Sequence, residues 1–276
     1  MRTFDMRTYT KLMADQHRNE LVQMIPERYN SIGDVCFKNN GKMKEIWLPL
    51  GCKVIGREAF YGCHIRKEVI LPGRLTEIRA GAFAGNCNLP RTDFPASLEK
   101  LGKQCYKDCN NLKSVRFASG SRCTEIPEGA FEGCVKLSEL ILPDGAETIG
   151  NRAFYKCKEL KKVRIPDSVI RIGEQAFYFC KLEELQLPDV LQELGDKAFF
   201  KCNGLKSVLI PKSVQKIGEG VFHGCNRLEY LEIHHDPEEI GPGIVNKSCT
   251  IRCRKGSRMD AYCEENGLKT EYIDER

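Results

Sequence analysis

The sequence lacks long apolar runs: no stretch approaches the roughly 18 consecutive apolar residues that identify a membrane-spanning helix. The opening segment MRTFDMRTYTKLMADQ also lacks the apolar core of a secretory signal. An excess of one charge is missing too, because 43 Lys and Arg residues face 38 Asp and Glu residues, for a net charge of +5. This balance argues against an obligate nucleic-acid binder. As written, the chain predicts a soluble protein with no nucleic-acid partner and no membrane insertion.

Cysteine is too scarce for a small disulfide-stabilised scaffold, in which it exceeds roughly 8–10% of the residues. The chain has 15 cysteines in 276 residues, an odd number. Apolar residues make up 41% of the sequence and the charges are interspersed, which excludes wholesale disorder. The chain therefore folds, and the positions of its cysteines are more informative than their number.

Aromatic residues recur at a nearly constant spacing along most of the chain. An Ala-Phe dipeptide ends at six positions in one phase: Phe60, Phe83, Phe131, Phe154, Phe177 and Phe199. The same phase is filled elsewhere by Phe37, Tyr106, Phe222 and Val245. Successive positions are 22 to 25 residues apart, and such a period indicates a stack of coils rather than two globular domains. We predict about ten coils, roughly 45–50 Å long at about 4.8 Å per coil.

One repeat is clearest in residues 160–180, LKKVRIPDSVIRIGEQAFYFC. Val163 and Ile165 alternate with polar residues, which predicts a strand with these two side chains pointing inward. Pro166 ends the strand because it has no N–H to donate to a neighbouring strand. Gly173 then predicts either a tight corner with positive φ or a close approach of two backbones.

A cysteine follows three residues after most of the aromatic positions. These cysteines are Cys63, Cys109, Cys134, Cys157, Cys180, Cys202 and Cys225, with Cys87 and Cys249 one residue late. We expect a column of small, buried thiols. Parallel inward-pointing side chains offer no pairing scheme that serves them all, so we expect them to be reduced. Reduced thiols favour a reducing or anaerobic setting.

The string LxxVxIPxxVxxIGxxAFxxCxxL resembles the BspA-type leucine-rich repeat, found in surface and secreted proteins of anaerobic bacteria and some parasitic protists. The resemblance implies a mainly β, right-handed leucine-rich-repeat coil stack of about ten 23-residue units with a parallel ladder sheet. It also implies adhesion or interaction and a secreted or cell-surface location. The sequence as written has no signal peptide, and free cysteines fit the cytoplasm or an anaerobic exterior equally well. A fold hosts many functions, so the resemblance constrains the fold more than the function.

Three segments follow from the limits of the repeat: an N-terminal segment or cap over residues 1–24, repeats over 25–248 and a C-terminal cap over 249–276. Residues 1–24 form a capping helix, a frayed end or a truncated repeat. A capping helix would be lined by Leu12, Met13, Leu21 and Val22.

Two further places depart from the repeat. Ser257 followed by Asp260 resembles a capping box and Gly267 sits where a glycine ends a helix, so the C-terminal cap should hold a small helix and a strand. The fourth unit has Ala118 in place of proline and two extra residues, which predicts a bulging loop at one rim.

Candidate catalytic or metal-binding residues lie where the repeat fails. Adjacent residues His234 and His235 point to opposite faces of a strand, so only one of them can join a metal site. Cys249, Cys253 and Cys263 lack the paired CxxC spacing of a structural zinc site. No catalytic or phosphate-binding motif occurs. We therefore predict no enzyme, no metal and no cofactor.

What remains is the outward face of the ladder strands. The only tryptophan, Trp47, has Ile70 beside it one coil on, and apolar side chains rimmed by polar ones resemble the centre of an interface. Strand propensity alone is an equal explanation. The candidate binding residues are Trp47, Ile70, Asp93, Arg116, Ile141, Lys162, Arg164, Gln186, Leu209 and Tyr230.

Two hypotheses of function follow. The first is a monomeric, non-catalytic protein-binding or adhesion module, whose ligand is a host or matrix protein if the resemblance carries over. Trp47, Ile70 and Tyr230 would then be apolar anchors. The alternative is a passive structural stalk of a larger cell-surface protein.

Overall fold

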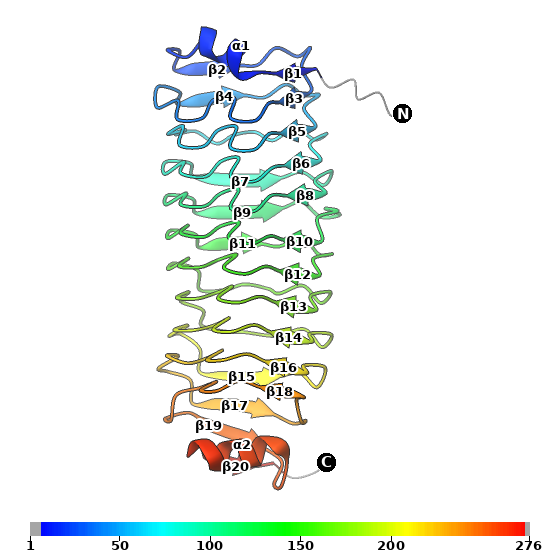
Figure 1. Ribbon diagram of the computed structural model, residues 1–276, viewed down its shortest axis with the longest axis vertical. Helices are drawn as coiled ribbons and strands as arrows, with labels where there is room; N and C mark the ends of the chain where they lie inside the picture. Colours follow the sequence, from blue (N-terminus) through cyan, green and yellow to red (C-terminus); the bar gives the residue numbers. More distant parts are fainter. Residues whose placement is uncertain (1–6, 274–276) are drawn as a thin grey trace.

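The computed structural model describes residues 7–273, which wind into a slender stack of coils (Figure 1). The stack has about 12 turns, and every strand pairing in the described residues is parallel. This confirms the predicted mainly β leucine-rich-repeat coil stack. The turns outnumber the ten expected because segments at both ends, outside the aromatic repeat, also contribute strands.

The ladder strands lie on one face of the stack and form three sheets. These are β2 (Val22–Met24) with β4 (Glu45–Trp47); β7 (Arg91–Phe94), β9 (Ser114–Phe117) and β11 (Glu139–Ile141); and β15 (Ser207–Ile210), β17 (Tyr230–Ile233), β19 (Thr250–Cys253) and β20 (Lys269–Tyr272). We call this surface the ladder face.

The ladder is interrupted, whereas a continuous sheet was expected. Residues 68–71, 162–165 and 184–187 follow the same path without regular strand pairing. In two of these coils the turn that precedes the ladder segment is one residue shorter than elsewhere. A single residue separates Cys63 from Ile65 and Cys180 from Leu182, where other coils have two.

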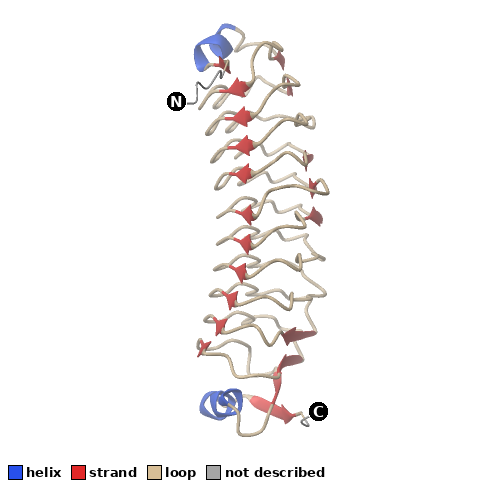
Figure 2. Cartoon of the chain, turned by 90° about the vertical axis from the view of Figure 1, so that its right-hand side faces the viewer, coloured by secondary structure: helices blue, strands red, loops and turns tan. Residues whose placement is uncertain are grey.

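A second set of two-residue strands lies on an adjacent side of the stack (Figure 2). One sheet holds β1 (Thr8–Tyr9), β3 (Ser31–Ile32), β5 (Val54–Ile55), β6 (Glu77–Ile78) and β8 (Lys100–Leu101). The other holds β10 (Glu125–Ile126), β12 (Thr148–Ile149), β13 (Arg171–Ile172), β14 (Glu193–Leu194), β16 (Lys216–Ile217) and β18 (Glu239–Ile240). The two sheets are separated by the two-residue insertion that follows β9, where Ser121 and Cys123 are buried and Arg122 is exposed.

The glycines after these strands are required by close backbone contact and not by positive φ. Gly195 lies outside the left-handed region, and a Cβ there would lie 2.5 Å from the backbone nitrogen of Glu174 and 2.7 Å from the carbonyl carbon of Gly173. Gly218 and Gly241 are confined in the same way by the preceding coil. The second of the two explanations derived from the sequence therefore holds.

Replacing Gly195 with alanine is expected to lower the free energy of unfolding by roughly 1–3 kcal/mol, because neighbouring coils must separate to admit the methyl group. Gly145 is the matched control, since a Cβ there meets nothing within 4 Å. Urea denaturation followed by circular dichroism measures both variants. Equal stability of the two variants would contradict the role assigned to the coil contact.

The core is a spine of stacked aromatic rings. Rings from successive coils, starting at Phe37 and running to Phe222, stack with centroids 5.0 to 5.7 Å apart. Tyr9 extends the spine by one ring at the N-terminal end. The predicted aromatic positions are all buried, and Val245 ends the series.

The seven in-phase cysteines form the predicted column, and all 15 cysteines are free thiols. Each column thiol donates a hydrogen bond to a carbonyl of the preceding coil, as Cys63 does to Phe37 at 2.9 Å and Cys157 to Phe131 at 3.4 Å. In the third coil this place is taken by Asn86, whose amide donates to the carbonyl of Phe60 at 2.7 Å. Cys87, expected one residue out of step in the column, lies outside it and is half-buried. Cys249 is buried beyond the column, and its thiol donates to the carbonyl of Thr250 instead.

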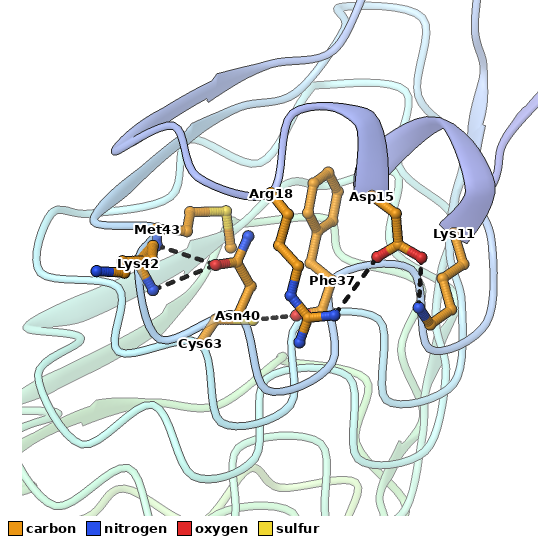
Figure 3. Close-up of polar contacts among 8 residues, drawn as sticks. All are labelled: Lys11, Asp15, Arg18, Phe37, Asn40, Lys42, Met43 and Cys63. Atoms are coloured by element: carbon orange, nitrogen blue, oxygen red, sulfur yellow. Dashed lines mark hydrogen bonds and ion pairs between the residues drawn. The ribbon is translucent and has the colours of Figure 1, made fainter.

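The N-terminal end is closed by a partial coil carrying helix α1 (Lys11–Gln16). Strands β1 and β2 pair with β3 and β4, so residues 8–24 continue both sets of strands. Helix α1 buries Ala14, and Met13 is partly buried against the core. Leu12, Leu21 and Val22 are exposed, so the expected apolar lining was wrong for these three residues. Figure 3 shows Asp15 of α1 paired with Lys11 and Arg18 above the first coil.

The C-terminal end is closed by helix α2 (Arg258–Asn266) followed by β20. The Ser257 hydroxyl accepts a hydrogen bond from the backbone N–H of Asp260 at 3.1 Å, and Gly267 ends the helix with a φ of 61°. Both features match the expectation from the sequence. The segment limits at residues 24 and 248 stay a prediction.

Candidate functional site

The strand register arranges the outward side chains of the ladder face in columns that run along the stack. Met24 lies beside Trp47, and Asp93 lies beside Arg116, which lies beside Ile141. Eight of the ten candidate residues are exposed, and Asp93 and Tyr230 are half-buried. The ten residues span nearly the whole length of the stack and do not form one compact site.

The apolar candidates meet at the N-terminal end of the ladder face. Trp47 is 52% exposed and Met24, its neighbour in register, is 74% exposed. Ile70 occupies the same column one coil further along and is 67% exposed. We call Met24, Trp47 and Ile70 the apolar patch.

Met24 was not among the candidate residues. The signal that identifies it is the sequence Met24-Ile25-Pro26, which repeats the pattern of Trp47-Leu48-Pro49. This match lies within residues 1–24, which the repeat pattern assigns to the N-terminal segment or cap.

The middle of the ladder face is covered by ion pairs between neighbouring coils. The Arg116 Nε lies 2.9 Å from Glu139, and the Arg91 Nε lies 2.8 Å from Glu68. Hydrogen bonds from Arg116 lower the pKa of the Glu139 carboxyl. Exposed pairs of this kind add little stability, so they serve the solubility of the face more than its stability.

Three polar candidates border one shallow hollow in the ladder face, where the strands lose their regular pairing. Lys162, Arg164 and Gln186 line it together with neighbouring carboxylates. Lys162 lies 3.7 Å from Glu184, and Arg164 lies 3.7 Å from Asp167. The hollow is polar and its charges face partners of opposite sign.

Tyr230 lies far from the apolar patch, near the C-terminal end of the stack (Figure 1). The Arg252 guanidinium covers its ring, 3.8 Å from the centroid, and pairs with Glu232 and Glu271 at 3.1 Å each. Tyr230 is therefore a covered side chain and cannot act together with Trp47 on a small ligand. Leu209 and Ile141 are exposed between the two ends as single apolar residues.

Residues 7–273 hold no group of three or more His, Cys, Asp or Glu side chains arranged to bind a metal ion. His235 Nε2 lies 2.6 Å from the carbonyl of Val214, and His234 lies beside Glu232. Burial raises the pKa of the column thiols, to about 12 for Cys63 and Cys225. Thiols with raised pKa values are poor nucleophiles, so the column is suited to packing and not to catalysis.

These features define a leucine-rich-repeat coil stack with an extended ladder face. The BspA type Leucine rich repeat region matches residues 30–123 and 124–252 in six copies, and the chain belongs to this family. The comparison with curated proteins gives no match. Neither helix of the described residues is long and apolar enough to cross a membrane.

The chain is also similar to solved structures of bacterial proteins. A leucine-rich repeat protein from Bacteroides ovatus is 23% identical, with 93% of this chain and 85% of that chain covered and a TM-score of 0.41. A leucine rich cell surface protein from Faecalibacterium prausnitzii is 21% identical, with 92% and 79% covered and a TM-score of 0.44. The pneumococcal vaccine antigen PcpA is 19% identical, with 93% and 79% covered and a TM-score of 0.42.

Proposed function

We propose that the chain is a non-catalytic protein-binding or adhesion module that engages its ligand through the ladder face. The observation that carries this proposal is the apolar patch, in which Met24, Trp47 and Ile70 lie in one column on neighbouring coils and are each at least half exposed. Large exposed apolar side chains next to one another mark interaction sites more often than scattered ones do. Membership of a repeat family with extended binding surfaces agrees with this function.

The ligand that suits the apolar patch is a protein with a complementary apolar surface, such as a host or matrix protein. Tryptophan is enriched among the residues that dominate binding energy, while rim charges mainly tune the association rate. Lys67 and Arg91 lie near the patch and are paired with Glu45 and Glu68. Charge therefore provides orientation at the rim, and the patch provides affinity.

The alternative is a passive stalk of a larger cell-surface protein. The ion pairs over the middle of the ladder face favour it, because a face whose charges pair with one another has little need of a partner. A cell-surface location and a monomeric state belong to this proposal as they do to the first.

Replacing Trp47 with alanine is expected to weaken binding to an immobilised matrix protein by about 30-fold or more, the effect of losing a dominant interface residue. The melting temperature should stay unchanged, because the side chain is half exposed. Val190, an exposed apolar residue off the ladder strands, provides the control variant Val190→Ala. Surface plasmon resonance against a panel of immobilised matrix proteins measures the affinities.

Two outcomes would favour the passive stalk over the binding module. One is the absence of binding to every protein of the panel by the unaltered chain. The other is unchanged affinity in a variant with alanine at Met24, Trp47 and Ile70.

A further inference from the structure

A second surface feature lies outside the ladder face, on the turns that carry the aromatic spine. The residues directly after the buried phenylalanines form an outer row of rings in four neighbouring coils. Tyr155 stacks on Tyr178 at 4.9 Å, Tyr178 on Phe200 at 4.8 Å and Phe200 on His223 at 5.7 Å. Tyr155, Tyr178 and Phe200 are half-buried and His223 is exposed. We call these four residues, with Lys156, Phe179 and Lys201, the aromatic strip.

The position one residue after each outer ring forms a second column of the strip, and its composition differs between coils. It is a left-handed position, where other coils place glycine, as at Gly62, or a short polar residue, as at Asn39 and Asp108. Three consecutive coils instead carry Lys156, Phe179 and Lys201, with φ between 57° and 64°. These three long side chains therefore stand where other coils have glycine or a short polar side chain.

The two lysines of the strip have no carboxylate partner. Among the described residues, no ion pair involves Lys156 or Lys201, whereas most neighbouring cations pair with a carboxylate of an adjacent coil. Lys156 lies instead over the Tyr155 ring, 5.0 Å from its centroid, and Lys201 over the rings of Phe179 and Phe200. Their charge is available to an anionic ligand.

The shape of the strip selects the kind of ligand. It is two residues wide and follows the long axis of the stack, whereas a globular partner needs about 800 Å² of contact on each side. An extended peptide binds through unpaired backbone groups, but the backbone here is occupied: the N–H groups of Lys156, Phe179 and Lys201 donate to carbonyls of the next coil. A linear polymer that presents side groups rather than a backbone fits better.

The spacing of the polar groups fits such a polymer. Lys156 and Lys201 are two coils apart, roughly 10 Å at the spacing of neighbouring strands. This is about the length of a disaccharide. No hydrogen bond within the described residues involves the Tyr155 and Tyr178 hydroxyl groups, which leaves them available to sugar hydroxyls.

We propose that the aromatic strip binds a linear anionic polysaccharide along the axis of the stack. Lys156 and Lys201 pair with its carboxylate or sulfate groups, and the sugar rings pack against the aromatic edges between them. This site is on a different face from the apolar patch and does not depend on the proposed protein-binding function.

The test measures binding of the full chain to polygalacturonate, heparin, poly-glutamate and neutral dextran by isothermal titration calorimetry. The variant Lys156→Gly/Lys201→Gly removes both charges and restores the residue that other coils use, so it should fold at least as well. We expect its affinity for the anionic polymer to fall about tenfold or more. The control Lys206→Gln/Lys212→Gln removes the same charge from two exposed lysines elsewhere and should leave the affinity unchanged.

The polymers also distinguish the two sources of negative charge. Binding to polygalacturonate alone identifies carboxylates, and binding to heparin alone identifies sulfates; either result supports the proposal. A further variant, Phe179→Gly, should weaken binding without removing charge.

Four results would overturn the proposal: no binding to either anionic polymer, equal binding to dextran, equal losses in the strip and control variants, or equally tight, strip-dependent binding of poly-glutamate. The last result would assign the strip to acidic peptides.

Discussion

The protein is expected to unfold cooperatively as the pH rises above about 9, because its buried thiols resist ionisation. Burial raises the pKa of Cys36, Cys52, Cys63 and Cys225 from an ordinary value of 9.0 to about 12. Between these values the unfolded chain has ionised thiols while the folded chain keeps them neutral. Ionisation therefore favours unfolding in this window and leaves stability unaffected below it.

The expected effect is large. Each thiol lowers the free energy of unfolding by about 1.4 kcal/mol per pH unit in this range, so these four lower it by about 5–6 kcal/mol per pH unit. Domains are usually stable by about 5–15 kcal/mol, so the transition should fall roughly one to three pH units above 9. Further thiols in the column, such as Cys134 and Cys157, have pKa values raised well beyond the ordinary range and steepen the transition.

Circular dichroism between pH 8 and about 12, in degassed buffer with a reductant, measures this transition. Thiolate absorbance should appear together with the loss of secondary structure. Gradual ionisation near pH 9 in a protein that keeps its circular dichroism would show that the thiols are accessible.

Thiol labelling at neutral pH provides the control. The half-buried Cys87 should react first, and the column thiols only after unfolding. A mass decrease of two hydrogens per cysteine pair would show that the column contains disulfides.

Replacing Phe154 with alanine is expected to lower the free energy of unfolding by about 3–5 kcal/mol. The ring is completely buried and stacks on Phe131 at 5.5 Å and on Phe177 at 5.2 Å. The variant leaves a cavity and removes both ring contacts. Because each coil contacts mainly its two neighbours, the lost contacts are those that join the coils before Phe154 to the coils after it.

Urea denaturation followed by circular dichroism measures this loss. The control is Tyr61→Ala, since Tyr61 follows the buried ring of its coil and is 38% exposed. Exposed positions usually change stability by about 0.5 kcal/mol or less. A Phe154 variant as stable as the Tyr61 variant would show that the spine does not carry the coil-to-coil packing.

The fold was predictable from the sequence because its packing is periodic. Residues such as Phe154 and Cys157 face the same neighbours in every coil, so burial imposes the same residue types at the same spacing. The position of Gly195 was equally clear, but two physical reasons fitted it, and only the measured approach of the Glu174 backbone decides between them. The interruptions of the ladder were not predictable, because residues 162–165 lie in a coil with the same spacing as coils that form paired strands.

The candidate sites were harder to predict because they depend on long side chains from different coils. Tyr230 has the spacing of an exposed residue, and its coverage depends on where Arg252 places its guanidinium. The aromatic strip does not follow from the aromatic repeat, because that repeat marks the buried ring, whereas Tyr178 and Phe200 each lie one residue beyond it. Outward positions tolerate many residue types, so a ring there stands out only when its neighbours in space are known.

The similarity of successive coils has a consequence for how such a gene changes. A duplicated stretch of about one period brings its own ring, thiol and glycine, so it enters the stack without requiring new partners elsewhere. The insertion after β9 is a smaller case: the chain accommodates two extra residues at the rim while β9 and β11 remain paired. The stack can therefore lengthen by whole coils. Coils added between the apolar patch and the aromatic strip would increase the distance between these two surfaces and leave the residues of each unchanged.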